Sequence, residues 1–168
     1  MKIIGVCGLA GSGKDTVADY LVAKHNYTKV SFAAILKDML RVAGLPEPTN
    51  RDDKEKIIEG FNFSWRHAAQ TLGTEYGRVC LGENIWIDLT MKSLREDGKY
   101  VVSDVRFENE ATAIRNVGNL IHLKGRGANL GELSAHASEA GVAYKSGDVL
   151  ISNDSSMELL YAGVELAL

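Results

Sequence analysis

A glycine-rich run between an apolar segment and a helical pattern restricts the fold of this chain more than any other feature. The run reads GLAGSGKDT at residues 8–16, and it follows the apolar segment KIIGVC at residues 2–7. After it, Val17 and Leu21 are four residues apart, as are Ala18 and Val22, which predicts a helix with one buried face. Strand, glycine-rich loop and helix in this order are typical of a phosphate-binding loop.

The residue types of the loop suit a polyphosphate ligand. Its glycines let the backbone turn tightly and bring N–H groups close to phosphate oxygens. The helix that begins near Gly13 directs its partial positive charge to the same anion, and Lys14 can reach the outer phosphates. We therefore expect a nucleotide to contact six consecutive residues, namely Gly11, Ser12, Gly13, Lys14, Asp15 and Thr16.

The residue after the lysine departs from the usual pattern. Ser or Thr normally stands there and ligates magnesium with its hydroxyl, whereas this chain has Asp15 followed by Thr16. A carboxylate is a good ligand for Mg²⁺ but an unfavourable neighbour of phosphate oxygens. One hypothesis is that Asp15 holds the metal, directly or through water, while Thr16 contacts an inner phosphate. The alternative is that Asp15 only lies favourably in the first turn of the helix.

Length, composition and charge describe an ordinary globular chain of one domain. The chain has 168 residues, of which 45% are apolar and 24% charged, and a net charge of −3. A protein that wraps nucleic-acid polymer usually has a basic surplus, and no segment approaches a membrane-spanning length. We therefore expect the protein to bind neither a nucleic-acid polymer nor a membrane. Cys7 and Cys80 show no metal-ligand or disulfide spacing, which favours a reduced, cytoplasmic setting.

Strand and helix patterns alternate along the chain, which predicts an α/β fold with a five-stranded parallel sheet and helices on both faces. The strand patterns cover residues 2–7, 28–32, 99–103, 119–123 and 148–152. The helical patterns after the first helix cover residues 33–42, 64–76, 84–95, 107–114 and 155–167. Ligands of such sheets bind at the carboxyl ends of the strands. We therefore expect the glycine-rich loop to lie close to the other residues that follow strands, which are Asp104, Arg106, Asn153 and Asp154.

The side chains around this edge favour phosphoryl transfer over hydrolysis. Asp104 ends a strand, where phosphate-loop enzymes keep a carboxylate near magnesium. Val105 follows it, instead of the Glu that activates water in motor-type ATPases, and the chain lacks the Asn-Lys-x-Asp motif of guanine switches. Basic residues surround the expected pocket: Arg66, Arg78, Arg106 and Arg126. A phosphate acceptor is already anionic, so it needs charge neutralisation and orientation, not a general base.

Several short motifs join these features. They are the Gly-Lys-Asp-Thr loop, RHAAQTLGTE at 66–75, Gly77-Arg78, Trp86, SDVR at 103–106 with Glu110, and ISND at 151–154. Together they resemble bacteriophage deoxynucleoside monophosphate kinases over nearly the whole chain. The resemblance implies a P-loop kinase fold, ATP and Mg²⁺ as cofactors, and phosphorylation of deoxynucleoside monophosphates to diphosphates. It further implies one domain with a core at 1–43, 99–124 and 147–168, an acceptor-binding insertion over about 44–98, and a lid over about 125–146.

The resemblance also implies roles for single residues. Arg66 and Gln70 share a helix face and would hold the phosphate and base of the acceptor, with Gly73 and Thr74 bringing the backbone close. Trp86 would pack against the base or shape its pocket; the alternative is a plain core residue. The implied catalytic residues are Lys14, Asp15, Arg66 and Arg126, and the implied metal ligands are Asp15 and Asp104, with Asp104 also near the substrate.

Two further pairs have alternative interpretations. Arg106 and Glu110 would bind the phosphate and sugar of the acceptor, or would form an ion pair on a helix surface. Asn153 and Asp154 would lie near the adenine of ATP, or would cap the last helix. Arg126 would act from the lid, in which His136, Ser138 and Glu139 also lie without an assigned role.

Two other functions stay open at this point. One is a kinase for another phosphorylated acceptor, such as a ribonucleotide or phosphomevalonate, and the other is a non-catalytic nucleotide-binding regulatory protein. The sequence leaves the accepted bases, the selectivity for deoxyribose and the oligomeric state open, although homodimers are common for this resemblance. A phage origin would place the protein in the host cytoplasm.

Overall fold

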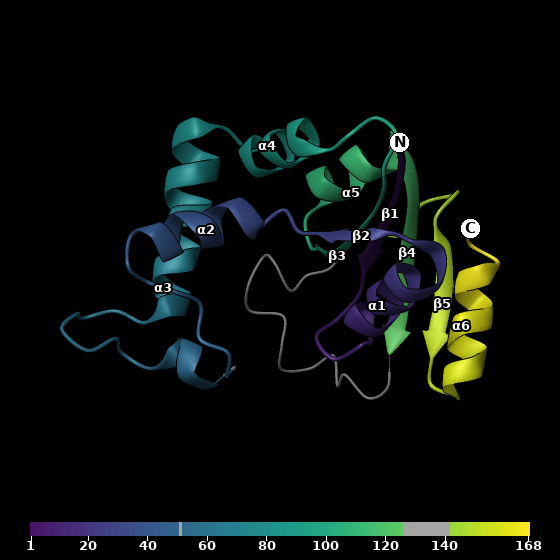
Figure 1. Ribbon diagram of the computed structural model, residues 1–168, viewed down its shortest axis with the longest axis horizontal. Coiled ribbons are helices and arrows are strands. Elements are labelled where there is room, and N and C mark those ends of the chain that lie inside the picture. Colours follow the sequence, from purple (N-terminus) through teal and green to yellow (C-terminus); the bar gives the residue numbers. More distant parts are fainter. Residues whose placement is uncertain (51, 126–141) are drawn as a thin grey trace. The chain divides into compact units, whose positions relative to one another are not determined.

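The computed structural model describes residues 1–50, 52–125 and 142–168. These residues form two compact units (Figure 1), the first made of Met1–Ser31 and Leu94–Leu168 and the second of Phe32–Ser93. The second unit begins earlier than the insertion expected from residue 44, because helix α2 (Ala34–Val42) packs against the other helices of that unit. Among the described residues, no helix is long and apolar enough to cross a membrane.

The first unit is built on a five-stranded parallel sheet, which confirms the predicted α/β fold. Its strands lie in the order β2-β3-β1-β4-β5. Their bounds are Lys2–Cys7 for β1, Thr28–Val30 for β2, Lys99–Val105 for β3, Gly118–Gly125 for β4 and Val149–Asn153 for β5. Because β1 is central, the loop that follows it has strand ends on both sides.

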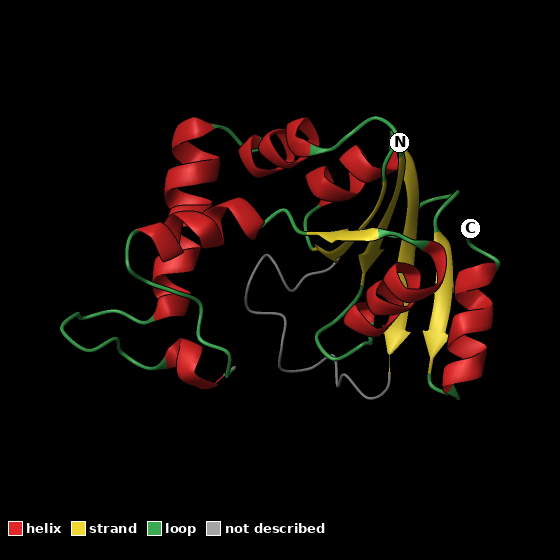
Figure 2. Ribbon diagram, viewed as in Figure 1, coloured by secondary structure: helices red, strands yellow, loops and turns green. Residues whose placement is uncertain are grey.

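Helices cover both faces of this sheet, as the alternating pattern predicts. Their bounds are Lys14–His25 for α1, Glu108–Arg115 for α5 and Met157–Glu165 for α6. Helices α1 and α6 pack on the face that carries Ile4 and Val6, and α6 lies beside β5 (Figure 2). Ile114 of α5 packs over Gly5 on the other face, since side chains of consecutive strand residues alternate in direction.

The second unit consists of helices around the buried residues Leu36, Leu40, Trp65 and Trp86. After α2 come a short 3₁₀ helix η1 (Asp52–Glu55), α3 (Trp65–Gln70), a π-helix η2 (Thr71–Leu81) and α4 (Ile85–Ser93). The side chain of Ser64 accepts from the backbone N–H of His67 at 3.2 Å, which confirms the predicted cap.

The sequence predicts one ordinary helix over 64–76, but the structure changes to a π-helix after Gln70. Such helices are rare, because their hydrogen-bond geometry is less favourable. The indole N–H of Trp86 donates to the carbonyl of Gly73 at 2.8 Å, inside the core. This bond and the packing of Trp86 against Gly77 give the π-helix tertiary support that a local pattern does not contain.

Gly77→Ala tests this packing. A Cβ atom at Gly77 would lie 2.4 Å from the ring of Trp86, so we expect a loss of about 1–3 kcal/mol in the free energy of unfolding from overpacking. Urea denaturation measures the loss. It should shrink when Trp86→Phe is added, because the smaller ring leaves room for the methyl group. If Gly77→Ala lowers the free energy of unfolding equally in the wild type and in Trp86→Phe, the contact with Trp86 is not what excludes a side chain at position 77.

Candidate functional site

The phosphate-binding loop joins β1 to α1 at the carboxyl edge of the sheet. Gly8, Gly11 and Gly13 all have positive φ angles, of 144°, 78° and 99°. At Gly13 a Cβ atom would also meet the amide nitrogen of Asn153 at 2.5 Å. A side chain is therefore excluded by both conformation and space at this position, which explains why the loop is rich in glycine.

Lys14 folds back onto the loop. Its ammonium group donates to the carbonyls of Gly8 and Leu9, both at 2.8 Å. Partial burial lowers the pKa of Lys14, and the positive charge of Arg106 lowers it further. Arg106 follows the end of β3, so the cations Lys14 and Arg106 both lie at the edge of the sheet that carries the loop.

Asp15, in the first turn of α1, contacts side chains of the adjacent strands β2 and β3. Its Oδ1 atom is 2.7 Å from Nζ of Lys29 and accepts from the hydroxyl of Ser103 at 3.3 Å. The hydrogen bond with Lys29 is the largest cause that lowers the pKa of Asp15. Neither contact was predicted from the sequence: Lys29 lies at a strand position outside any motif, and Ser103, within the SDVR motif, had no role assigned to it.

Asp104 lies at the end of β3, half-buried, and its Oδ2 atom accepts from the hydroxyl of Ser31 at 2.5 Å. Asp15 and Asp104 both act on the charge of Lys14, so both carboxylates lie near the loop. Carboxylates are the hard oxygen ligands that Mg²⁺ prefers, and phosphate oxygens usually supply further ligands. The described residues contain no group of three or more His, Cys, Asp or Glu side chains able to hold a metal. The two carboxylates, Asp15 and Asp104, are of the ligand type that suits Mg²⁺.

Glu110 is buried and binds the backbone where β3 leads into α5. It is 4% exposed, and its Oε2 atom accepts from the backbone N–H groups of Arg106 at 2.8 Å and Phe107 at 3.1 Å. These bonds fix the chain where α5 begins. The alternative of an ion pair on the helix surface is wrong, because the carboxylate is buried.

Asn153 contacts the phosphate loop directly. Its side-chain amide donates to the carbonyl of Ser12 at 2.9 Å. The last helix is capped by Ser156, whose hydroxyl accepts from the N–H of Leu159, so the alternative of a cap by Asn153 or Asp154 is wrong. Asp154 is exposed. A position of either residue near adenine stays a prediction.

In the second unit, α3 carries both Arg66 and Gln70, as predicted. Arg66 forms an ion pair with Glu55. Thr74 is exposed on the π-helix, whereas Gly73 is buried.

Trp86 lies in the core of the second unit, which agrees with the alternative interpretation of Trp86 as a plain core residue. It is 4% exposed, and its indole N–H is bonded to the carbonyl of Gly73. A direct stack of its ring on a base does not fit this burial. Its polar contact is with the backbone of the π-helix, at Gly73.

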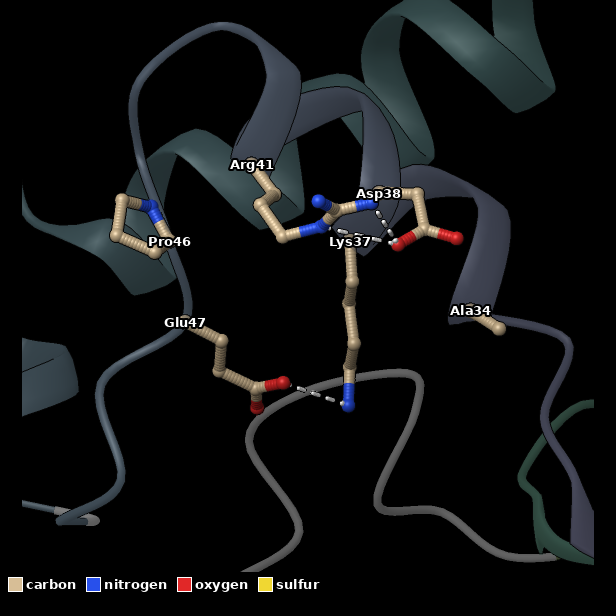
Figure 3. A pocket seen from close by; sticks show the side chains of 6 residues that line it. All are labelled: Ala34, Lys37, Asp38, Arg41, Pro46 and Glu47. Carbon is tan, nitrogen blue, oxygen red and sulfur yellow. Dashed lines mark hydrogen bonds and ion pairs between the residues drawn. The ribbon is translucent and has the colours of Figure 1, made fainter.

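A pocket of about 400 Å³ opens between α2 and the segment that follows it. Its lining residues are Ala34, Lys37, Asp38, Arg41, Pro46 and Glu47 (Figure 3). Lys37 pairs with Glu47 at 3.1 Å, and Arg41 pairs with Asp38 at 3.2 Å. The sequence analysis missed this pocket, although the spacing of Lys37 and Arg41 by four residues places both on one helix face.

The predicted lid residues Arg126, His136, Ser138 and Glu139 lie outside the described residues. Of the other predicted cations, Arg78 donates to the carbonyl of Glu83 at 3.2 Å.

The parallel sheet and its glycine-rich loop define an α/β protein of the P-loop class. Comparison with known proteins is more specific: residues 46–164 match the family model of deoxynucleotide monophosphate kinase. The chain belongs to this family, and it is therefore a phosphotransferase.

Individual relatives agree with this assignment. A protein of Acanthamoeba polyphaga mimivirus is 28% identical over 98% of this chain and 94% of its own length. The deoxynucleotide monophosphate kinase of Enterobacteria phage T4 is 24% identical over 98% of both chains. Among solved structures, a gluconokinase from Sinorhizobium meliloti 1021 covers 99% of this chain and 93% of its own, with 15% identity and a TM-score of 0.48. That likeness is too weak to support a conclusion.

Proposed function

We propose that this protein transfers the γ-phosphoryl group of ATP to the phosphate of a deoxynucleoside monophosphate, with Mg²⁺ as the metal cofactor. The observation that carries the proposal is the family match over residues 46–164, on a chain whose residues 8–16 form a phosphate-binding loop. The first unit would bind ATP, and the second would bind the acceptor.

The residues of the first unit would act on the phosphate chain of ATP. The backbone N–H groups of the loop would hold phosphate oxygens, and Lys14 would neutralise charge on the transferred group. Arg106, whose backbone N–H donates to Glu110, would add a second cation. Asp15 and Asp104 would hold Mg²⁺, which neutralises the charge that develops on the phosphate oxygens when it is bound.

The residues of the second unit would orient the acceptor. Arg66 would bind its phosphate, as would Lys37 and Arg41 of the pocket, while Gln70 and Thr74 are exposed for contacts to the base. Because the acceptor oxygen is anionic at neutral pH, these cations lower the repulsion between the two phosphates and no proton acceptor is required. The segment that contains Arg126 would supply the lid.

A panel of acceptors tests the proposed function. The panel contains deoxynucleoside monophosphates, ribonucleoside monophosphates and phosphomevalonate, each with ATP and Mg²⁺, and the readout is coupled release of ADP. We expect turnover on at least one deoxynucleoside monophosphate and none without Mg²⁺. Turnover of phosphomevalonate with none on any nucleotide would overturn the choice of acceptor. Binding of ATP with no product from any acceptor would favour a regulatory protein instead.

A further inference from the structure

A lysine from the edge strand lies beside the aspartate that replaces the usual Ser or Thr of the loop. Nζ of Lys29, in β2, is 2.7 Å from Asp15 Oδ1 and 3.1 Å from Asp19 Oδ1. Asp15 and Asp19 are one helical turn apart on α1, so one ammonium group faces both carboxylates. The same ion pairs raise the pKa of Lys29 above its ordinary value.

The carboxylate of Asp15 creates an electrostatic problem that a Ser or Thr hydroxyl does not. It adds a negative charge in the first turn of α1, next to the loop where a polyphosphate would bind. An aspartate carboxylate is charged at neutral pH, and this one lies 2.7 Å from the ammonium group of Lys29. Without a metal ion or another cation beside it, this carboxylate would repel the phosphates.

We propose that Lys29 is the charge partner that makes the Gly-Lys-Asp loop able to bind a polyphosphate. The Asp15–Lys29 pair then has the net charge of the neutral Ser or Thr that it replaces. The hydroxyl of Ser103, on the neighbouring strand β3, holds the same carboxylate oxygen. Lys29 is thus a positioning residue that acts through Asp15. The proposal rests on the proposed use of ATP.

The solvent exposure of the Asp15–Lys29 pair allows a role in nucleotide binding to be distinguished from a role in folding stability. The side chains of Lys29 and Asp15 are 36% and 82% exposed, and exposed ion pairs contribute little to folding stability. A phosphate chain bound beside the pair displaces water, which strengthens the interaction between the remaining charges. Loss of Lys29 should therefore weaken nucleotide binding while the thermal unfolding temperature stays nearly constant.

A double-mutant cycle on ATP binding tests the proposal. Binding is measured by calorimetry in EDTA, so that no metal contributes. We expect Lys29→Met to weaken ATP binding roughly tenfold, and the added Asp15→Ser substitution to restore most of the affinity that Lys29→Met loses. Lys2→Met is the matched control, since Lys2 is an exposed lysine at the amino end of the central strand β1, away from the loop at its carboxyl end; this variant should bind ATP as the wild type does.

The outcomes distinguish this inference from the proposed function. Equal weakening in Lys29→Met and in the double variant would overturn it, because Lys29 would then act on the phosphates and not through Asp15. Wild-type affinity of Lys29→Met would overturn it as well. A wild-type protein that shows the expected cycle but phosphorylates no acceptor would leave the inference standing and refute the kinase. A wild type that binds no ATP, either in EDTA or with Mg²⁺, would overturn both.

Discussion

Lys14→Ala is expected to lower the turnover number for phosphoryl transfer by at least ~100-fold, because one preorganised positive charge on the transferred group is lost. The ammonium group of Lys14 donates to the carbonyls of Gly8 and Leu9, which keeps it beside the loop. A transition state that spreads negative charge over phosphate oxygens gains from such a fixed cation. Steady-state kinetics at saturating ATP and acceptor measure the effect.

Two controls belong to this experiment. Lys24→Ala removes a lysine from the last turn of the same helix, and it should leave the turnover number near that of the wild type. Thermal unfolding of Lys14→Ala shows whether the variant is folded. A folded Lys14→Ala variant with near-normal turnover would refute the role of Lys14.

Arg115→Ala should lower the free energy of unfolding by about 3–5 kcal/mol, because it leaves a buried carboxylate without its main partner. The side chain of Asp148 is 2% exposed, and Arg115 binds both of its oxygens, at 2.8 and 2.7 Å. His122 and the backbone N–H of Lys145 also contact this carboxylate, at 2.9 and 2.8 Å. Denaturation by urea at neutral pH measures the loss. Arg41→Ala, which breaks an exposed pair with Asp38, is the control and should cost under about 1 kcal/mol.

The same network predicts a pH dependence of stability. Arg115 holds the pKa of Asp148 well below its ordinary value. A carboxylate with a lowered folded pKa stabilises the protein above its unfolded pKa of about 3.9, and this contribution is lost as the pH falls further. Arg115→Ala should therefore lose less stability than the wild type between about pH 5 and pH 3. An equal loss in both proteins would show that this pair does not control the acid response.

Regular alternation of strand and helix patterns made most of the fold predictable. Apolar runs flanked by glycine or polar residues identify the five strands, and the observed bounds of β1 equal the predicted ones. Hydrophobic spacing likewise predicts α1, α2 and α4, since it reflects burial of one helix face. Ser64 was recognisable as a cap because capping depends on residues within one turn.

Features that depend on contacts between distant segments were not predictable. The π-helix after Gln70 depends on Trp86, which follows Gly73 by 13 residues. Glu110 has the spacing of a surface partner for Arg106, but the packing of α5 against β1 and β4 buries it. Asn153 reaches Ser12, 141 residues earlier, because the strand order places β5 only one strand, β4, away from β1.

The phosphate-binding loop was determined by the sequence alone, since glycines, an adjacent lysine and flanking apolar segments all act within about 20 residues. The partners of its charged groups were decided by the tertiary structure. Asp15 meets Ser103, 88 residues away, and Lys29, because β2 and β3 lie side by side next to α1. Local patterns encode which residues turn, coil or extend. Which charges then neutralise one another depends on strand order, and strand order results from the burial of the whole sheet.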